Sequence, residues 1–350
     1  MAAMRSFVNP PKAKPGDSLA VISPASGLPG ILPLPFDLGL RRLADNFGLT
    51  AIEYPTTRKM GATPQERAAD VHAAFSDERV TAVIASIGGS DQIKVLRHLD
   101  PDLLRAHPKP FFGLSDNTNL LNYLWNLGIT SFHGTTVMTS LGRGGAMHPL
   151  TEESFRAAIF EAGPYELRAS KDYNDIDHSW DVPENLEKEP PMMPSDGWTW
   201  HGPSRRVSGI SWGGNLEILG WNLAAGRYIK DSDAYAGCVF YFETSEEMPS
   251  ATEVYRLLMQ AGERGLLEQF AAVLVGRPKA WSFDQQNSPE AKTEYISGQV
   301  DAVLRALGEY APDVPVVTGL DIGHTDPQLT IPNGAMITVD AVERRIFVEY

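Results

Sequence analysis

The sequence is poor in cysteine, in basic residues and in long apolar runs. Cys238 is the single cysteine among 350 residues, so no intramolecular disulfide can form. It lies in an apolar run, which predicts a buried strand thiol rather than a reactive one. Lys and Arg number 30 against 44 Asp and Glu, giving a net charge of −14 at pH 7. A nucleic-acid partner is not expected, because phosphate binding requires clustered basic side chains.

The apolar runs fall short of the roughly 20 residues that span a bilayer. The segment Met1–Arg5 leads into polar, proline-containing sequence and lacks the apolar centre of a signal peptide. We therefore expect a cytoplasmic protein with no membrane partner. The histidines and acidic residues lack metal-site spacing, so no metal and no other cofactor is predicted.

Hydrophobic residues make up 43% of the chain and charged residues 21%, as in a globular protein of about two domains. Short apolar runs alternate with helical spacing from residue 18 to about 150. The expected strands are 19–22, 82–85 and 110–113, and the expected helices are 37–47, 65–75 and 117–127. This alternation predicts an α/β fold, with a mostly parallel sheet and flanking helices in an amidotransferase-like or flavodoxin-like layer.

The alternation stops between about 171 and 206, where Asp-rich and Pro-rich sequence predicts a long interdomain loop. We assign residues 1–170 to an N-terminal α/β domain and residues 207–350 to a smaller mixed C-terminal domain. In the latter, expected helices at 216–224 and 252–261 mix with expected strands at 239–242, 271–275, 314–317 and 336–339.

The strongest local motif is Gly113-Leu114-Ser115-Asp116-Asn117, where a buried strand runs directly into a helix. This order predicts a nucleophile elbow. The Ser115 hydroxyl would project at the sheet edge, and the N–H of Asp116 would face the same space and bind an oxyanion. The motif differs from the Gly-x-Ser-x-Gly of α/β-hydrolases, so a plain helix N-cap is the alternative interpretation.

A second strand-to-helix turn contains Gly88-Gly89-Ser90. Paired glycines let the backbone approach a ligand closely, so the N–H of Gly89 is a candidate for the other oxyanion donor. The alternative is an ordinary tight turn. The spacing does not match a phosphate-binding loop.

A serine nucleophile requires a base to remove its proton. Among eight histidines, His324 follows a buried strand within a turn-rich loop, where a presented base is expected. His133 is a candidate core residue or a residue behind the site. The other histidines lie on helices or in polar loops.

The base in turn requires a buried carboxylate that orients it. Glu243 ends the most apolar strand of the second domain, and a charged residue rarely ends such a run facing inward unless it is paired. The following Glu246, Glu247 and Glu253 lie in a polar segment and are expected to be solvated.

Six short motifs follow one another along nearly the whole chain. They are Ser23-Pro24-Ala25-Ser26, Gly88-Gly89-Ser90, Gly113-Leu114-Ser115-Asp116, Gly213-Gly214-Asn215-Leu216, Phe242-Glu243 and Asp321-Ile322-Gly323-His324-Thr325-Asp326. Together they resemble the LD-carboxypeptidase family of serine peptidases, and more closely its microcin C immunity branch. The resemblance implies a triad of Ser115, Glu243 and His324, with the serine in the N-terminal domain and its partners in the C-terminal domain.

The resemblance also implies a metal-free hydrolase, usually a homodimer, that removes a C-terminal group from a short peptide or an amino-acid conjugate. Immunity-branch members cleave the amide between an acidic aminoacyl group and a nucleotide, as in processed microcin C. Muramyl LD-carboxypeptidases instead act on murein tetrapeptide, which is the first alternative. The alternative from another class is a non-catalytic ligand-binding protein on the same fold.

Two features favour the immunity branch. The chain is long for the family, and the extra length falls in the 171–206 loop with Trp180, Trp198 and Trp200, whose rings could stack on a nucleobase. The alternative is that these rings pack the domain joint. The motif containing Ser90 also replaces a tyrosine-containing version found in murein-specific members. Ser90, Trp180 and Trp200 are therefore the candidate substrate-binding residues.

Overall fold

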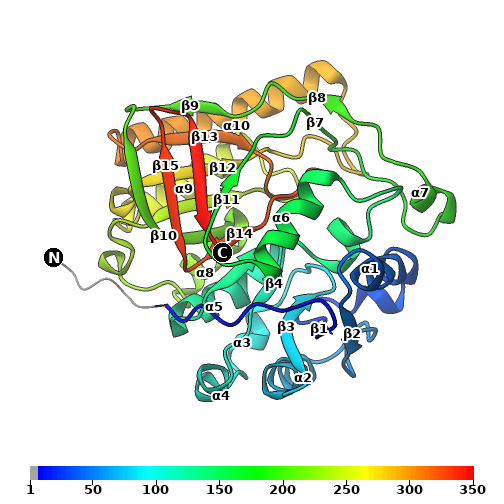
Figure 1. Ribbon diagram of the computed structural model, residues 1–350. Coiled ribbons are helices and arrows are strands. Elements are labelled where there is room, and N and C mark those ends of the chain that lie inside the picture. Colours follow the sequence, from blue (N-terminus) through cyan, green and yellow to red (C-terminus); the bar gives the residue numbers. More distant parts are fainter. Residues whose placement is uncertain (1–6) are drawn as a thin grey trace.

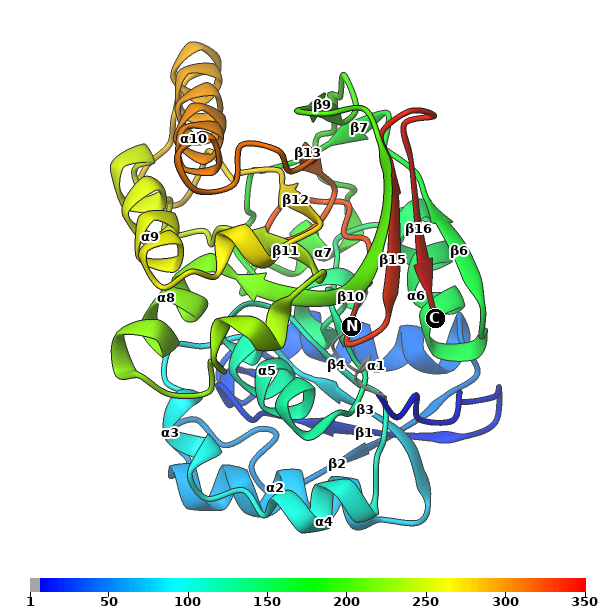
Figure 2. The same ribbon diagram turned by 90° about the vertical axis from the view of Figure 1, so that its left-hand side faces the viewer.

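Two β-sheets with their helices make up the protein. The computed structural model describes residues 7–350, so the segment Met1–Arg5 discussed above lies outside the described residues. Figure 2 shows the first sheet and its helices in the lower half and the second sheet in the upper half. This arrangement confirms the predicted α/β class with parallel-rich sheets.

The first sheet has six strands in the order β14-β5-β4-β3-β1-β2. All neighbours are parallel except β14 and β5, which are antiparallel. The strands are β1 (Ser18–Ile22), β2 (Thr50–Glu53), β3 (Val80–Ala85), β4 (Phe111–Gly113), β5 (Ser131–His133) and β14 (Ile331–Asn333). The helices of this unit are α1 (Pro33–Asp45), α2 (Pro64–Ser76), α3 (Ile93–Leu96), α4 (Pro101–Ala106), α5 (Thr118–Leu127) and α6 (Pro149–Phe160).

The second sheet has eight strands in the order β6-β16-β15-β10-β11-β12-β13-β9, with β10 to β13 parallel in its centre. The strands are β6 (Pro164–Leu167), β9 (Thr199–His201), β10 (Arg206–Asn215), β11 (Val239–Glu243), β12 (Ala272–Gly276), β13 (Val316–Leu320), β15 (Met336–Asp340) and β16 (Arg345–Glu349). Its helices are α8 (Leu216–Ala225), α9 (Ala251–Glu263) and α10 (Pro289–Tyr310).

Three strands lie outside the unit to which their stretch of sequence was assigned. β6 comes from residues 1–170 and β9 from residues 171–206, yet both extend the second sheet. β14 comes from residues 207–350 and forms the edge of the first sheet. The second sheet is therefore wider than a smaller mixed domain suggests, and the chain crosses repeatedly between the two units.

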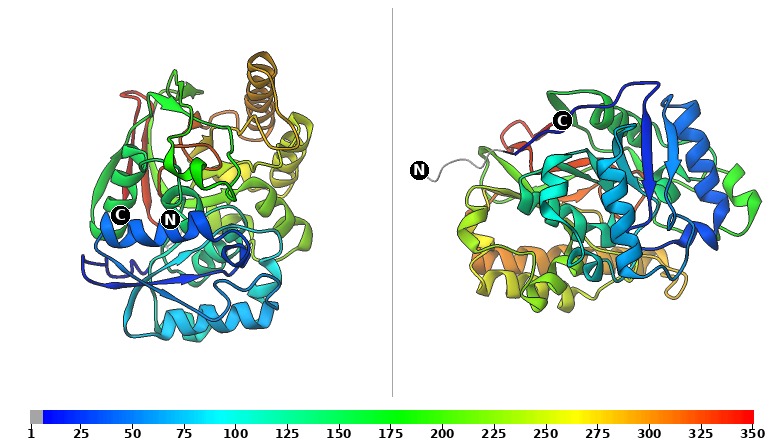
Figure 3. Two further views of the ribbon diagram at one scale, coloured as in Figure 1. Left: turned by 90° about the vertical axis from the view of Figure 1, so that its right-hand side faces the viewer. Right: turned by 90° about the horizontal axis from the view of Figure 1, so that it is seen from below.

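Local sequence explains where several helices begin. At the start of α2, Thr63 accepts the backbone N–H of Glu66 while the Glu66 carboxylate accepts the backbone N–H of Thr63. Ser250 and Glu253 form the same reciprocal cap at the start of α9. Such caps satisfy donors that a helix N-terminus leaves without partners. In the left panel of Figure 3, α10 (orange) stands at the upper right, at the edge of the second unit.

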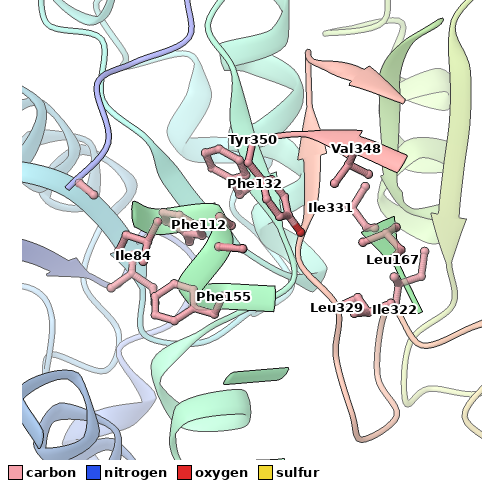
Figure 4. Packing of buried hydrophobic residues seen from close by; sticks show 14 of the residues in the cluster. Ile84, Phe112, Phe132, Phe155, Leu167, Ile322, Leu329, Ile331, Val348 and Tyr350 are labelled. Carbon is pink, nitrogen blue, oxygen red and sulfur yellow. The ribbon is translucent and has the colours of Figure 1, made fainter. Parts of the chain in front are cut away.

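Apolar side chains of both units share one buried cluster. Phe112 of β4 stacks on Phe132 of β5 with ring centroids 4.7 Å apart, and Phe155 of α6 meets Phe112 edge-on at 5.2 Å. Figure 4 shows these rings in the same cluster as Ile331 of β14 and Val348 of β16. The packing holds the carboxyl end of β4, where the predicted elbow begins, against the second unit.

Residues 171–206 form a strap along both units. The strap contains β7 (Asp172–Tyr173), α7 (Pro183–Glu187), β8 (Met193–Pro194) and β9, and Figure 1 shows α7 beside α1. Toward the first unit, the N–H of Gly145 donates to the carbonyl of Leu186 at 2.9 Å. Toward the second, buried Asp175 pairs with Lys292 of α10. The strap thus bridges the units instead of standing clear of them.

Among residues 7–350, none of the helices combines the length and the apolar character needed to cross a membrane.

Candidate active site

Ser115 occupies a strained turn between β4 and α5. Ser115 is the first residue of a short 3-10 turn, Ser115–Asn117, that leads into the helix, and its φ of 63° lies in the left-handed region. A non-glycine residue is uncommon there, and strained backbone of this kind concentrates at functional sites. The sharp strand-to-helix turn expected for a nucleophile elbow is present, with the serine partly exposed at its apex.

The Asp116 side chain ties the glycine turn to the elbow. Its Oδ2 accepts the backbone N–H groups of Asp91 and Gln92, both at 2.9 Å, and its Oδ1 accepts from Asn119 at 2.8 Å. Burial raises the pKa of Asp116 to about 6. The sequence had suggested a role only for the N–H of Asp116, which lies in the first turn of a helix, where N–H groups lack intrahelical acceptors. The structure adds a role for the carboxyl group.

Gln92 and Asn117 make a second link between the same two turns. The Gln92 side-chain amide donates to Asn117 Oδ1 at 2.9 Å, and the Asn117 amide donates to the carbonyl of Ile87 at 3.0 Å. Arg67 adds an ion pair to Asp91 at 2.8 Å. Because Gln92 and Asn117 are fully buried and hydrogen-bonded, they keep the glycine turn in one position relative to Ser115.

Gly88 is the glycine that faces the serine. A Cβ at Gly88 would lie 2.8 Å from the Ser115 Cβ and 3.1 Å from its Oγ, whereas a Cβ at Gly89 would meet Ala25. Gly89 and Ser90 are exposed beside this contact. Their roles as oxyanion donor and substrate contact stay predictions, and Gly88 is added as a residue whose missing side chain leaves room for the nucleophile.

The structure brings Glu243 and His324 together. The His324 Nδ1 and the Glu243 Oε2 are 2.6 Å apart, and since an ionised carboxylate only accepts, Nδ1–H is the donor. Glu243 is fully buried at the end of β11. Burial alone would raise the pKa of Glu243, but the charge of His324 and its hydrogen bond to the carboxylate outweigh burial and lower the pKa below its ordinary value.

Two connections bring the elbow to this pair. Gly113 of β4 is in register with His133 of β5, whose Nε2 lies 3.6 Å from Glu243 Oε1, just beyond a hydrogen bond. Three residues after the serine, Thr118 accepts the backbone N–H of Asn215 at 2.9 Å, and Asn215 is in register with Glu243. Serine, glutamate and histidine, predicted from distant segments, therefore converge where the two units meet.

The loop that carries His324 depends on residues that sequence reasoning had not singled out individually. Gly323 has a φ of 97°, and a Cβ there would lie 2.5 Å from Glu243 Oε2, so only glycine lets the loop close on the carboxylate. Buried Asp321 accepts from Arg277 at 3.0 Å and from the indole N–H of Trp198 at 2.9 Å. Gly323 and Asp321 belong to the same short motif as His324, and this membership is the signal by which the sequence could have identified them.

Glu246 makes a contact that we had not expected. Its side chain is 56% exposed, in line with a solvated residue, but its Oε2 lies 3.1 Å from His324 Nε2. Glu246 is thus exposed as expected, and the structure adds a contact with His324 that the sequence did not indicate. Burial lowers the pKa of His324, but the carboxylates of Glu243 and Glu246 outweigh burial and raise that pKa well above its ordinary value.

The predicted tryptophans lie against the protein interior. Trp180, Trp198 and Trp200 are partly buried and pack on the main apolar cluster. Trp200 is in β9, in register with Val317 of β13. These contacts agree with the alternative that the rings pack the domain joint, and stacking of Trp180 or Trp200 on a ligand stays a prediction. Within residues 7–350, no group of three or more His, Cys, Asp or Glu side chains is arranged to hold a metal ion.

A serine on a strained strand-to-helix turn and a hydrogen-bonded His–Glu pair are features of a serine hydrolase of the α/β type. The chain belongs to the LD-carboxypeptidase family, because the model of the LD-carboxypeptidase N-terminal domain matches residues 19–134 and that of the C-terminal domain matches residues 208–339. It is accordingly a serine carboxypeptidase.

Curated relatives fall on both sides of the family. The chain is 25% identical to the microcin C7 self-immunity protein MccF of Escherichia coli, over 82% of this chain and 78% of that protein. It is 29% identical to the murein tetrapeptide carboxypeptidase of Pseudomonas aeruginosa, over 79% of this chain and 78% of that protein. A solved structure of MccF in complex with glutamyl sulfamoyl guanosine superposes with a TM-score of 0.81, at 22% identity and with 97% and 98% of the chains covered, so the fold is shared.

Proposed function

We propose that the protein hydrolyses the amide of an aminoacyl nucleotide, such as processed microcin C, through Ser115, His324 and Glu243. The observation that carries this proposal is the 2.6 Å contact between His324 Nδ1 and Glu243 Oε2, and the strained elbow at Ser115 supports it. A buried carboxylate that accepts from one imidazole nitrogen leaves the other nitrogen to act on a serine hydroxyl.

In the proposed mechanism His324 takes the proton of Ser115 Oγ as the oxygen attacks the scissile carbonyl carbon. The N–H groups of Gly89 and Asp116 stabilise the oxyanion, and His324 then passes the proton to the leaving amine. Water attacks the acyl-enzyme in a second round and restores Ser115. Glu243 keeps the imidazole in one tautomer and stabilises its charged form.

The choice of substrate rests on similarity and on the strap. MccF is similar to this chain along its length and has been solved with an aminoacyl sulfamoyl nucleoside. The strap places Trp180, Trp198 and Trp200 on the chain between the two units, where an aromatic face would suit a nucleobase. Similarity to a murein tetrapeptide carboxypeptidase supports release of D-alanine from murein tetrapeptide as the second candidate.

The experiment compares the protein with its Ser115→Ala variant on aspartyl sulfamoyl adenosine and on murein tetrapeptide, with products followed by mass spectrometry. Cleavage of the adenosine conjugate that drops by at least about a thousandfold in kcat in the variant is expected. Release of D-alanine alone would select the second candidate. Undiminished cleavage by Ser115→Ala would contradict the serine mechanism, and cleavage of neither compound would favour a ligand-binding protein.

A further inference from the structure

The contact between Glu246 and His324 indicates what the site requires of its substrate, and the inference rests on the proposed function. We propose that Glu246 is a specificity-determining residue that accepts the free α-ammonium group of the substrate's acyl residue. Binding of the ammonium draws the Glu246 carboxylate off His324 and leaves the imidazole able to accept the proton of Ser115. The favoured substrates are aminoacyl conjugates with an unblocked amine, and a peptide with an acylated nitrogen at that position is disfavoured.

Without substrate, Glu246 occupies the nitrogen that catalysis needs. Glu243 takes Nδ1 of His324, so Nε2 is the nitrogen left to accept a proton from Ser115, yet Glu246 Oε2 lies 3.1 Å from it. A carboxylate only accepts, so this contact requires a proton on Nε2. With protons on both nitrogens, His324 is an imidazolium. It becomes a base when Glu246 moves away and the Nε2 proton passes to water.

The turn that presents Glu246 is anchored, while the Glu246 side chain itself is not. Ser245 donates its backbone N–H and its hydroxyl to Oε1 of Glu217, at 2.8 and 2.6 Å, and the N–H of Glu247 donates to the Ser245 hydroxyl. The Glu217 side chain on α8 is nearly buried. The turn therefore stays in place while the exposed Glu246 carboxylate can rotate about its own bonds from His324 to a ligand.

The charges near Glu246 favour a cationic ligand group. Within residues 7–350, His324 is the ion-pair partner of Glu246, and no Lys or Arg pairs with it. Glu243, at the other nitrogen of the His324 ring, adds negative charge nearby. A substrate ammonium would replace the positive charge that Glu246 loses when His324 becomes neutral, so recognition and activation of the base are coupled.

Covalent geometry places the α-ammonium within reach. In an aminoacyl group the α-nitrogen lies about 2.5 Å from the scissile carbonyl carbon. Ser115 Oγ attacks that carbon, and a working base lies within about 3 Å of the serine oxygen. The α-nitrogen therefore falls next to the space where Glu246 now meets Nε2, whereas the terminal amine of a long basic side chain would fall well beyond it.

The test uses aspartyl sulfamoyl adenosine and its N-acetyl derivative, which share one scissile bond and one leaving group. We expect the protein to cleave the free-amine compound with kcat/KM at least about tenfold higher, and Glu246→Gln to bring the two values within about twofold. Glu247→Gln is the matched control, because it removes the same charge from the next exposed residue and should retain the preference. Equal cleavage by the unmodified protein, or a preference unchanged in Glu246→Gln, would overturn the proposal.

A binding measurement keeps the proposal separate from the proposed function. Calorimetry with Ser115→Ala should show at least about tenfold tighter binding of the free amine than of the acetylated compound, and Ser115→Ala/Glu246→Gln should lose this difference. The result stands even if the physiological conjugate is another one and turnover is absent. Equal affinities in Ser115→Ala, or no binding of either compound, would refute the role of Glu246.

Discussion

Glycine at position 88 is required by the nucleophile rather than by its own backbone. Because a Cβ there would lie 2.8 Å from the Ser115 Cβ, Gly88→Ala should displace the Ser115 side chain from the position in which its hydroxyl attacks the substrate. A misplacement on the order of 1 Å can lower kcat about a hundredfold, and we expect a loss of that size with little change in thermal stability. Steady-state kinetics and thermal unfolding measure both.

Gly308→Ala is the control for this substitution. Gly308 lies on the exposed side of α10, and a Cβ there would meet nothing within 4 Å. Alanine in an open helix position should leave kcat unchanged and raise the unfolding free energy by about 0.5–1 kcal/mol. Full activity of Gly88→Ala would show that the serine is not held as closely as the structure indicates.

The pKa of His324 predicts an alkaline displacement of the pH profile. Burial lowers this pKa, and the carboxylates of Glu243 and Glu246 raise it to a level well above the ordinary histidine value. Since only the neutral imidazole accepts the serine proton, kcat/KM should rise with pH through a value above 6.5 and be lost below it. An acid limb centred at or below 6.5 would contradict this assignment.

At the scale of elements, the elbow and the glycine turn form one unit through Asp116. Asp116→Ala leaves the N–H groups of Asp91 and Gln92 without their acceptor, which should lower the unfolding free energy by about 2–4 kcal/mol and lower kcat. Denaturant unfolding measures the first effect. Asp116→Asn, which keeps one oxygen acceptor, should be milder.

The same pair of variants separates hydrogen bonding from charge. Burial raises the pKa of folded Asp116 to about 6, above its ordinary value of 3.8. The folded state thus binds this proton more tightly than the unfolded state, so the contribution of Asp116 to stability falls as pH rises from about 4 to about 6. Asp116→Asn should lack this decline in stability. If the stability of that variant depends on pH in the same way, a group other than Asp116 causes the decline.

Local periodicity predicted the elements that lie around the site but not all of their partners. The runs at 19–22, 82–85 and 110–113 correspond to β1, β3 and β4, since buried parallel strands have a continuous apolar sequence. The 22-residue helix α10 was not predicted, although Pro289–Tyr310 is long. Its apolar positions are diluted by charged ones, because only one side packs on α9 and the second sheet.

At the scale of the whole molecule, buried ion pairs hold the strap to the second unit. Lys292→Met would leave Asp175, whose side chain has no exposed area, without its counter-charge. Loss of one partner of a buried pair costs about 3–5 kcal/mol, and we expect the unfolding free energy to fall by that amount. Hydrogen exchange should also rise in residues 172–180.

An exposed pair on the same helix is the control. Arg305 and Glu309 of α10 have side chains 62% and 42% exposed, so Arg305→Ala should cost about 1 kcal/mol or less. Equal effects of the two variants would mean that Asp175 is solvated or finds another partner. A homodimer, implied by the family resemblance, stays a prediction at this scale.

The sequence by itself determined the α/β class and the family, and it predicted a triad of Ser115, Glu243 and His324, because strand-end motifs and apolar periodicity are properties of short stretches. Tertiary structure decided which side chains meet there. The approach of Glu246 to His324, the contact of Gly88 with Ser115 and the exchange of β14 into the first sheet join segments far apart in the chain. Such contacts depend on how the two units pack, which no local pattern encodes.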